Sequence, residues 1–523
     1  MYKEKTVEEE TGLRKFFGKY DEKVFYPLVA LLVAVIGFII YDHKSFQSVF
    51  DSMNQWLIFN FAWGFQSIAF VSIIFAIWLS LSRYGKLKLG KDDETPEFST
   101  LAWVSMMFSA GFGISMWMWC SAEVIYHLHT SAAVADAGAT GKAAGVPIAL
   151  QSVFMDWGVH GWVLFAVGGF AVAFPSYRLG RPMNLASGLY GILKERSYTS
   201  FWGKLTDVAG ALAALGGTAA ALGFGLMMIN YGLKTILGIE IGFAGKVIAM
   251  IFLVAAFVAS AVSGIKRGIK VLSLVNIYMS VILCGFLVIV GPTNYIFTTV
   301  VESVGRYINF FADYSLWGDA KTFTDGAWKS RGWNNWWLVF FIIWWISYIP
   351  FCGGFIARIS RGRTVREYIL GSVLFPTGIT ILFFGIWSAV AAHLEVTGTV
   401  ALYDAIKNDF GSTIYVVLQQ FPLASLTCLF VFISSIIYGV TTYDSTTYFI
   451  SMQVAGGEAD PKISMRILWG AVIGFLGLVF LSIGNFDAMK ALAIVSGAPF
   501  ALVLVVYMIS SVRMLKMADR GEM

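Results

Sequence analysis

Long apolar segments alternate with short polar connectors along the whole chain. A helix needs about 20 mainly apolar residues to cross the hydrocarbon core of a membrane, and only helices and closed barrels satisfy their backbone groups there. Twelve segments have the required character: 24–42, 57–82, 101–127, 149–175, 207–236, 244–264, 271–299, 334–357, 368–393, 421–453, 465–484 and 488–511. The pattern predicts an all-α membrane protein with about 12 transmembrane helices.

The polar segments predict the topology. Residues 1–23 carry charges of both signs and are typical of a cytosolic tail, as are the short residues 512–523. The longest connector, 300–333, contains an amphipathic stretch at Val300–Phe311, which predicts a helix on the outer surface. If residue 1 lies in the cytosol, the inner loops carry more Lys and Arg than the outer loops, as the positive-inside rule requires. We therefore expect a multi-pass protein of the cell inner (plasma) membrane with both termini in the cytosol.

Composition supports this class and excludes others. Among the 523 residues, 58% are hydrophobic and 13% are charged, and mean hydropathy is +0.72. Soluble domains usually hold about 25% charged residues, so a soluble enzyme, a nucleic-acid-binding protein and a disordered scaffold are excluded for the chain as a whole. The four cysteines stand singly in apolar segments, which indicates packing residues rather than disulfides or a metal site.

Enzyme and channel signatures are absent from the sequence. None of the five histidines has HExxH spacing, and there is no phosphate-binding GxxxxGK[ST] loop. There is also no TVGYG-like potassium filter. The chain is therefore predicted to be no enzyme but a carrier driven by an ion or exchange gradient.

Three segments carry candidate chemistry. In the third span, the glycines of Ser109–Ser115 (SAGFGIS) either unwind the helix and free backbone groups for a ligand, or allow close helix packing. In the tenth span, the hydroxyls of Val440–Thr447 (VTTYDSTT) suit a small cation. Such hydroxyls more often bond to their own helix, and on this segment alone we favour that alternative.

Aromatic residues form the third candidate. Tryptophan is usually enriched at membrane interfaces, but one group lies about ten residues inside the eighth span, too deep for an interfacial belt. Tryptophan faces around one space can hold a quaternary ammonium through cation–π attraction. The residues are Trp157, Trp162 and Phe165 in the fourth span, with Trp344, Trp345 and Tyr348 in the eighth.

Residues 344–367 (WWISYIPFCGGFIARISRGRTVRE) resemble the signature of the betaine/choline/carnitine transporter (BCCT) family. The resemblance continues over nearly the whole chain, through PEFST (96–100), MMFSAGFGI (106–114), DWGVHGW (156–162) and Gly291-Pro292. It implies two inverted five-helix repeats (spans 3–7 and 8–12) behind two N-terminal helices. The corresponding divisions are two peripheral helices in 24–100, the first repeat in 101–299, the surface helix and outer loop in 300–333, and the second repeat in 334–511. The family also implies a homotrimer, assembled partly through the surface helix.

The resemblance assigns roles by position. The six aromatic residues of the fourth and eighth spans match the family's substrate cage. The main sodium site of the sodium-coupled members matches backbone oxygens of Ser109 and Phe112, with Tyr438, Thr441 and Thr442. Thr218 and Phe351 match part of a second sodium site, whose other threonine is Ala214 here.

Three further positions depart from the family pattern. Asn276 stands where sodium-independent carnitine exchangers carry an Arg that replaces the ion. Ser115 stands where choline members have Asp and betaine carriers have Gly. Asp156 replaces the usual His before the first cage tryptophan. An aspartate there either contacts a substrate amine or takes a proton, or it caps backbone groups at the outer entrance. These alternatives remain open.

Together these features predict sodium-coupled symport of a small betaine-type zwitterion, with sodium as the only cofactor, membrane lipid around the protein and no nucleic-acid partner. Sodium-independent exchange of related betaines is the alternative, and a channel or non-transporting osmosensor is a third. The short segment after Val512 lacks the long basic tail of osmotically activated members, which favours nutrient uptake over osmotic gating.

Overall fold

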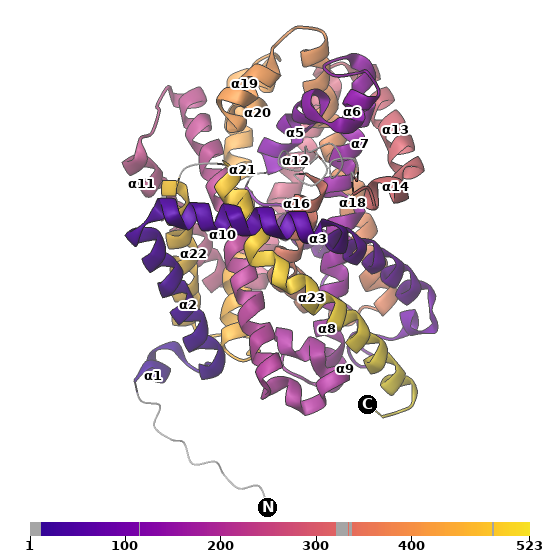
Figure 1. The fold of residues 1–523 in the computed structure, drawn as a ribbon, viewed down its shortest axis with the longest axis vertical. Coiled ribbons are helices and arrows are strands. Elements are labelled where there is room, and N and C mark those ends of the chain that lie inside the picture. Colours follow the sequence, from indigo (N-terminus) through magenta and orange to yellow (C-terminus); the bar gives the residue numbers. More distant parts are fainter. Residues whose placement is uncertain are drawn as a thin grey trace, which may run out of the picture.

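A computed structural model describes residues 12–114, 116–318, 320, 333, 337–483 and 486–522. Within these ranges the chain is built from helices and contains no β-strand, as the sequence predicted (Figure 1). The long helices are α2 (Glu22–Tyr41), α3 (His43–Leu81), α4 (Thr100–Gly111), α5 (Met116–Thr130), α7 (Val146–Trp157), α8 (Val159–Leu179), α10 (Phe201–Leu237), α11 (Phe243–Ser263), α12 (Lys270–Val290), α13 (Thr293–Asn309), α16 (Leu338–Tyr348), α18 (Val365–Val396), α21 (Ala424–Val454), α22 (Ile463–Ile483) and α23 (Phe486–Asp519).

The number of spans agrees with the sequence pattern. Ten helical segments of the described chain are long and apolar enough to cross a membrane, and the bent pair α4–α5 makes an eleventh. The remaining predicted segment, 465–484, falls on α22, whose described apolar part is shorter, Ile463–Val479. A multi-span helical membrane protein is thus confirmed.

Two predicted boundaries were wrong. The segment 271–299 is not one helix: α12 ends at Val290, and α13 begins at Thr293. The break follows from Gly291-Pro292, because proline cannot donate to the preceding turn and favours the first positions of a new helix. The second span begins at His43 and not near residue 57, since Asp42 caps α3 by accepting from the backbone N–H groups of Lys44 and Ser45.

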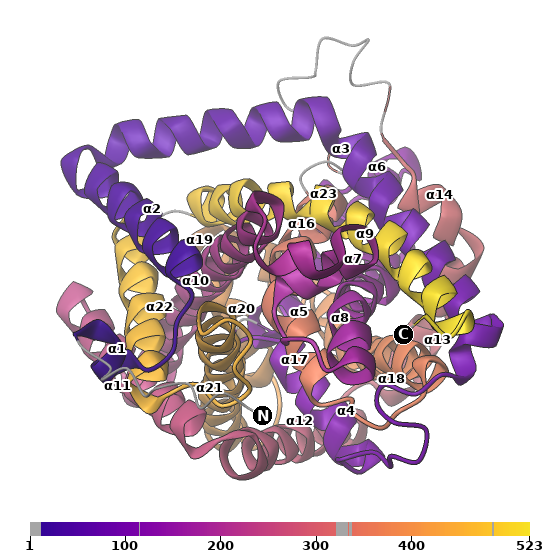
Figure 2. The same ribbon diagram turned by 90° about the horizontal axis from the view of Figure 1, so that it is seen from below.

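The two N-terminal helices lie at the periphery. Figures 1 and 2 show α2 and α3 running along the outside of the bundle, where α3 packs against α23, α8 and α18. The central helices are much more deeply buried. In the most apolar 18 residues of Leu338–Ile359 every residue is buried inside the protein, whereas in those of α2 only 28% are buried. The eighth span is therefore enclosed by other helices and is available to line a site.

Both ends of the described chain lie on the same side of the molecule. Lys462 Nζ donates to Lys15 O of α1 (Leu13–Phe17) at 2.7 Å, so the first helix contacts the connector before α22. At the other end, Arg83 Nη2 lies 2.5 Å from Asp519 Oδ2, next to the connector after α3. Both connectors belong to the predicted inner set, which is the arrangement expected of an even number of spans.

The same side carries a pairing between the start of the third span and the end of the eighth. The backbone of Leu89 exchanges hydrogen bonds with Gly362 and Arg363, each 2.8 Å long. Trp103 Nε1 donates to Ser360 Oγ at 2.8 Å, and the Arg363 guanidinium lies 3.9 Å from the centre of the Trp103 ring. The ARISRGR segment thus joins the first helices of the two predicted repeats.

Candidate functional site

Two of the central spans are interrupted at mid-length. Between α4 and α5 the chain bends by 63° at Phe112–Ile114. In the eighth span, a π-helical turn at Ile349–Gly353 separates α16 from the short α17 (Gly354–Arg358). Interrupted helices expose backbone groups at membrane depth, which is tolerated only where they are buried in protein or line a ligand site.

An aromatic box lies beside the first interruption. We use this name for the rings of Trp157, Trp162, Phe165, Trp345, Phe112 and Phe384. Ring centres are 5.2 Å apart for Trp157 and Trp345, and 5.7 Å apart for Phe165 and each of its neighbours Trp162 and Trp345. Neighbouring rings in these three pairs are close to perpendicular, so faces and edges alternate around the box.

Hydrogen bonds fix two of the indoles. Trp157 Nε1 donates to Glu123 Oε2 of α5, and Trp345 Nε1 donates to the backbone oxygen of Asp156, both at 2.7 Å. A buried indole N–H requires a partner, and these partners set the orientation of the rings. The polar edges of Trp157 and Trp345 are thereby satisfied by hydrogen bonds within the protein.

The other two predicted cage residues, Trp344 and Tyr348, pack against Trp345, and the Trp344 ring centre also lies 6.3 Å from that of Trp157. The Trp344 ring stacks on Trp345 with centres 5.7 Å apart, and the Tyr348 ring centre is 6.1 Å from that of Trp345. Trp344 Nε1 donates to Gly217 O of α10 at 3.4 Å. Trp344 and Tyr348 therefore form a second layer that supports Trp345.

Two members of the box were missed from the sequence. Phe384 of α18 lies 4.7 Å from Trp157 and 5.9 Å from Phe112, between ring centres. It stands in a long apolar helix among many phenylalanines, so no local signal marks it. Phe112 was expected to contribute only its backbone oxygen, but its ring stacks on Trp157 at 5.4 Å and lies 5.6 Å from Trp162.

Glycine is required where the box meets the bend. A Cβ atom added at Gly111 would lie 2.6 Å from Cη2 of Trp162, too close for any side chain. Gly161 has a similar role under Trp345, whose ring would lie 3.0 Å from an added Cβ. The alternative raised from the sequence, close packing, thus holds for Gly111, while the helix is also interrupted immediately after it.

Three oxygens expected to bind sodium meet at the bend. Thr442 Oγ1 of α21 is 3.1 Å from both Ser109 O and Phe112 O. All three residues are buried. The hydroxyl has one hydrogen to donate and faces two carbonyl oxygens, so the group presents several hard oxygen ligands, the chemistry that a small cation requires.

The two other residues of this set are engaged differently. Thr441 Oγ1 lies near two carbonyls of its own helix, Ile437 O at 3.1 Å and Tyr438 O at 3.0 Å, and accepts from Asn276 Nδ2 at 3.5 Å. The hydroxyl of Tyr438 lies 2.9 Å from Ser280 Oγ of α12. Asn276 thus contacts the candidate cation site through a neutral amide.

The second predicted sodium site has less support. Thr218 Oγ1 donates within its own helix, to Ala214 O at 2.6 Å, and the Phe351 ring packs on Tyr348 at 4.7 Å. Ala214 offers no side-chain oxygen. Ser115, predicted to contact substrate, lies outside the described residues.

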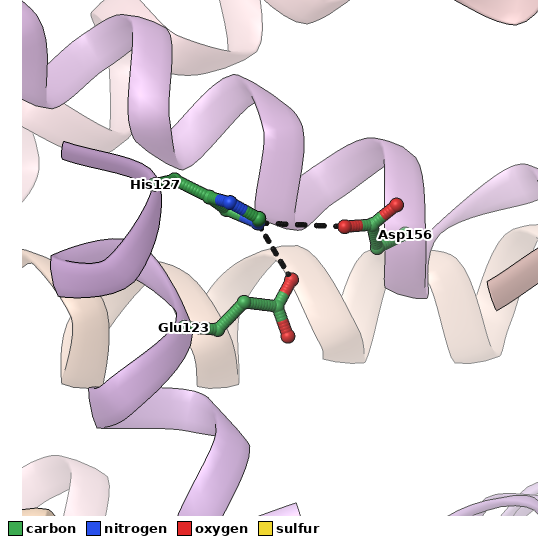
Figure 3. A group of neighbouring side chains, drawn as sticks. All are labelled: Glu123, His127 and Asp156. Carbon is green, nitrogen blue, oxygen red and sulfur yellow. Dashed lines mark hydrogen bonds and ion pairs between the residues drawn. The ribbon is translucent and has the colours of Figure 1, made fainter. Parts of the chain in front are cut away.

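Asp156 lies in a buried cluster above the box. His127 Nε2 is 3.3 Å from Glu123 Oε1 and 3.4 Å from Asp156 Oδ2, and Figure 3 shows the imidazole directed at both carboxyl groups. We call these three residues the acid–histidine cluster. Sequence reasoning singled out Asp156 alone. Glu123 and His127 are four residues apart on one face of α5, a spacing that marks a pair but not its partner on α7.

Comparison with known proteins gives a consistent result. A family model described as "BCCT, betaine/carnitine/choline family transporter" matches residues 23–520. A glycine betaine transporter, OpuD, of Bacillus subtilis (strain 168) is 32% identical over 96% of each chain. An ectoine/hydroxyectoine transporter of Virgibacillus pantothenticus is 29% identical, over 96% of this chain and 97% of the relative. An osmo-independent choline transporter, BetT1, of Acinetobacter baylyi is 29% identical over 96% of each chain.

Proposed function

The chain belongs to the betaine/carnitine/choline transporter family, and from this premise we propose that it is a sodium-coupled symporter of a small betaine-type zwitterion. The cationic head of the substrate, a quaternary ammonium or a related group, binds in the aromatic box. The family membership and the deep burial of the box support this assignment.

The observation that carries the proposal is the convergence of ring faces in a region without solvent exposure. Trp157, Trp162 and Trp345 retain only 2–3% of their surface. Each cation–π contact contributes about 0.5–2 kcal/mol, and more where water is excluded. The carboxyl groups of Glu123 and Asp156 already contact His127, and Glu123 also accepts from the Trp157 indole, so the box selects a head group that needs no hydrogen bond.

Sodium is proposed to bind at the bend, held by Ser109 O, Phe112 O and the Thr442 hydroxyl, with Thr441 and Tyr438 next to it. The donor set fits, because it consists of uncharged oxygens from an interrupted helix and a hydroxyl. The second set, Thr218 and Phe351, is retained only as a minor candidate. Bound sodium would supply a positive charge that holds α4 and α5 to α21.

Transport then follows from the placement of both sites between the two predicted repeats. The α4–α5 bend belongs to the first repeat and α21 to the second, so any rearrangement of one repeat against the other opens or closes contacts at Thr442. The backbone oxygens of the bend and the ring of Phe112 move together, which links ion and substrate binding.

Assembly and orientation complete the proposal. Three protomers are proposed to associate through α13, on which Phe297, Val301 and Ile308 are 49%, 71% and 71% exposed. An apolar surface of this kind outside the hydrocarbon core suits a protein partner. Both termini are proposed to lie in the cytosol of a cell whose plasma membrane holds the protein.

The test is uptake of radiolabelled glycine betaine into proteoliposomes under a sodium gradient, with potassium as the matched control. We expect uptake against the concentration gradient only with sodium. Equal uptake in potassium would reject sodium coupling and favour exchange of related betaines, which would then be tested by preloading vesicles with unlabelled glycine betaine. Flux of glycine betaine that only runs down its own concentration gradient, whichever cation is present, would favour the channel.

A further inference from the structure

The acid–histidine cluster is closed off from solvent. Glu123 and His127 side chains are 0% exposed and the Asp156 side chain is 2% exposed. Each of the three residues offers one atom that can ligate a cation, and these three atoms lie within 4.8 Å of one another. Buried ionisable groups at membrane depth are costly and mark ion or proton sites.

Hydrogen bonding within the cluster is incomplete. One imidazole nitrogen, Nε2, faces two carboxyl oxygens, and it can donate to only one of them (Figure 3). Asp156 Oδ2, the oxygen directed at the ring, accepts no hydrogen bond from the described residues, nor does His127 Nδ1 have a partner there. One added proton on a carboxyl group would supply the missing donor. A second proton on the imidazole would instead create a buried N–H without an acceptor.

The balance of charges also favours a proton, and not a metal ion, as the ligand of the cluster. The positive charge of the Lys490 ammonium, from α23, interacts electrostatically with all three members of the cluster. Lys490 is itself only 3% exposed. Two carboxylates and one ammonium leave one negative charge in excess. A proton makes the group neutral, whereas a divalent metal ion would leave one positive charge in excess, in a region where either excess is unfavourable.

Among the residues that the structure describes, the remaining neighbours of the cluster do not supply this charge. On α5, the thiol of Cys120 lies near Glu123. The phenol of Tyr314, from α14 (Phe311–Ser315), lies near Asp156. The helix α18 also packs against α5 and α7. Its ion pair with α5 joins Glu395 to His129 and not to the cluster.

We propose that the acid–histidine cluster binds one proton and releases it when a cationic head enters the aromatic box. This inference rests on the proposed function, because it needs a positive charge in the box. Two contacts connect the sites. Glu123 Oε2 accepts from Trp157 Nε1, and the backbone oxygen of Asp156 accepts from Trp345 Nε1.

Both the charges and the contacts indicate that proton binding weakens substrate binding. A proton in the cluster and a cation in the box are like charges and oppose each other. A charged Glu123 is also the stronger acceptor for Trp157 Nε1, so the deprotonated cluster holds the box in order. Substrate affinity therefore rises with pH. By linkage, the substrate lowers proton affinity by the same factor.

The size of the effect is set by separation. Two unit charges about 8 Å apart at an effective dielectric of about 20 change affinity by a factor on the order of ten to thirty. Between pH 5.5 and 8.5, glycine betaine itself has no titrating group, so the dissociation constant should fall by about tenfold across the range. Because a ten- to thirtyfold coupling shifts the proton affinity by the same factor, about half to two thirds of a proton should be released per bound molecule near the midpoint.

The experiment uses the full chain in nanodiscs. Tryptophan fluorescence gives the dissociation constant of glycine betaine at each pH and constant sodium, and an indicator dye in weak buffer counts released protons. Asp156→Asn and Glu123→Gln should each bind with little pH dependence and release no proton. Glu395→Gln removes a comparable carboxyl group paired with His129, 2.8 Å away, and should behave as the unmodified protein.

A measurement without substrate separates this inference from the proposed function. The infrared band of a protonated carboxyl group should be present in the ligand-free protein and reduced in Asp156→Asn. If the band is unchanged, or if affinity for glycine betaine does not vary with pH, the inference is overturned and the symporter proposal stands. If glycine betaine does not bind at any pH, the proposed function fails. Stoichiometric binding of Zn²⁺ that Asp156→Asn abolishes would replace the proton by a metal and overturn the inference.

Discussion

Removal of the Thr442 hydroxyl tests the proposed coupling most directly. In the structure Thr442 Oγ1 is 3.1 Å from Ser109 O and 3.1 Å from Phe112 O, and it links the side chain of α21 to the backbone of the bend. Thr442→Ala leaves both carbonyls without this partner. The substitution deletes one oxygen and one methyl group and keeps the helix, because alanine is the strongest helix former.

The magnitude can be set from the contacts. A neutral hydrogen bond contributes about 0.5–1.5 kcal/mol net, so the free energy of unfolding should fall by about this amount. A contact with a charged group is worth about 1.5–3 kcal/mol, and its loss corresponds to roughly tenfold to 150-fold weaker sodium binding. The effect on sodium should therefore exceed the effect on folding.

The assay is glycine betaine binding in nanodiscs against sodium, with potassium keeping the ionic strength constant. Thr442→Ala should shift the sodium midpoint upward, and Thr442→Ser should restore it. Thr446→Ala is the matched control, since the Thr446 hydroxyl donates to Thr442 O of its own helix at 2.9 Å. If Thr442→Ala and Thr446→Ala titrate like the unmodified protein, the proposed sodium site is wrong.

Three further outcomes are expected. Trp345→Leu should weaken glycine betaine binding about two- to thirtyfold by removing a ring face, whereas Trp202→Leu, at a 64% exposed position, should not; equal affinities would contradict the box. Thr218→Ala should leave the sodium midpoint nearly unchanged in the same titration, and a large shift would restore the second site. The Arg361 guanidinium beside Glu94 lowers the pKa of that carboxyl. The ion pair therefore stabilises the folded state above about pH 4.3, and this stabilisation is lost as pH falls through the lowered pKa. Arg361→Ala should reduce this acid sensitivity in thermal unfolding and cost at most about 1 kcal/mol at neutral pH; unchanged sensitivity would contradict it.

The sequence predicted the spans well because a membrane imposes one simple rule. Segments of about 20 apolar residues must be helices, and the prediction holds wherever a helix is straight. It was wrong where chain chemistry interrupts an apolar run. Gly291-Pro292 divides the seventh segment. In the fourth segment Gly158 separates α7 from α8, but Ala143–Leu179 still forms one span, as predicted. An added Cβ at Gly158 would lie 2.3 Å from Phe154 O, so the interruption is built into the packing.

The candidate site could be predicted only in part. Trp345 was singled out by its depth in the eighth span and Trp157 by its place in the family motif, and the structure brings their rings within 5.2 Å of each other. Phe384 could not be found, because a phenylalanine in an apolar helix has the same pattern whether it faces lipid, core or ligand. The acid–histidine cluster needed the structure for a similar reason: Glu123 and Asp156 are 33 positions apart in sequence, and only the packing of α5 on α7 places both beside His127.

One residue joins the two proposed sites, and this gives coupling a physical basis. The backbone oxygen of Phe112 contacts Thr442, while its ring stacks on Trp157 with centres 5.4 Å apart. Because Phe112 follows the last residue of α4, its φ and ψ angles set both positions at once. A cation that fixes the carbonyl therefore also fixes one face of the box, and the two binding free energies cannot be independent. Phe112→Leu keeps the backbone oxygen and removes the ring. It should weaken glycine betaine binding and reduce the effect of sodium on that binding, whereas a full sodium effect in this variant would show that coupling runs through another contact.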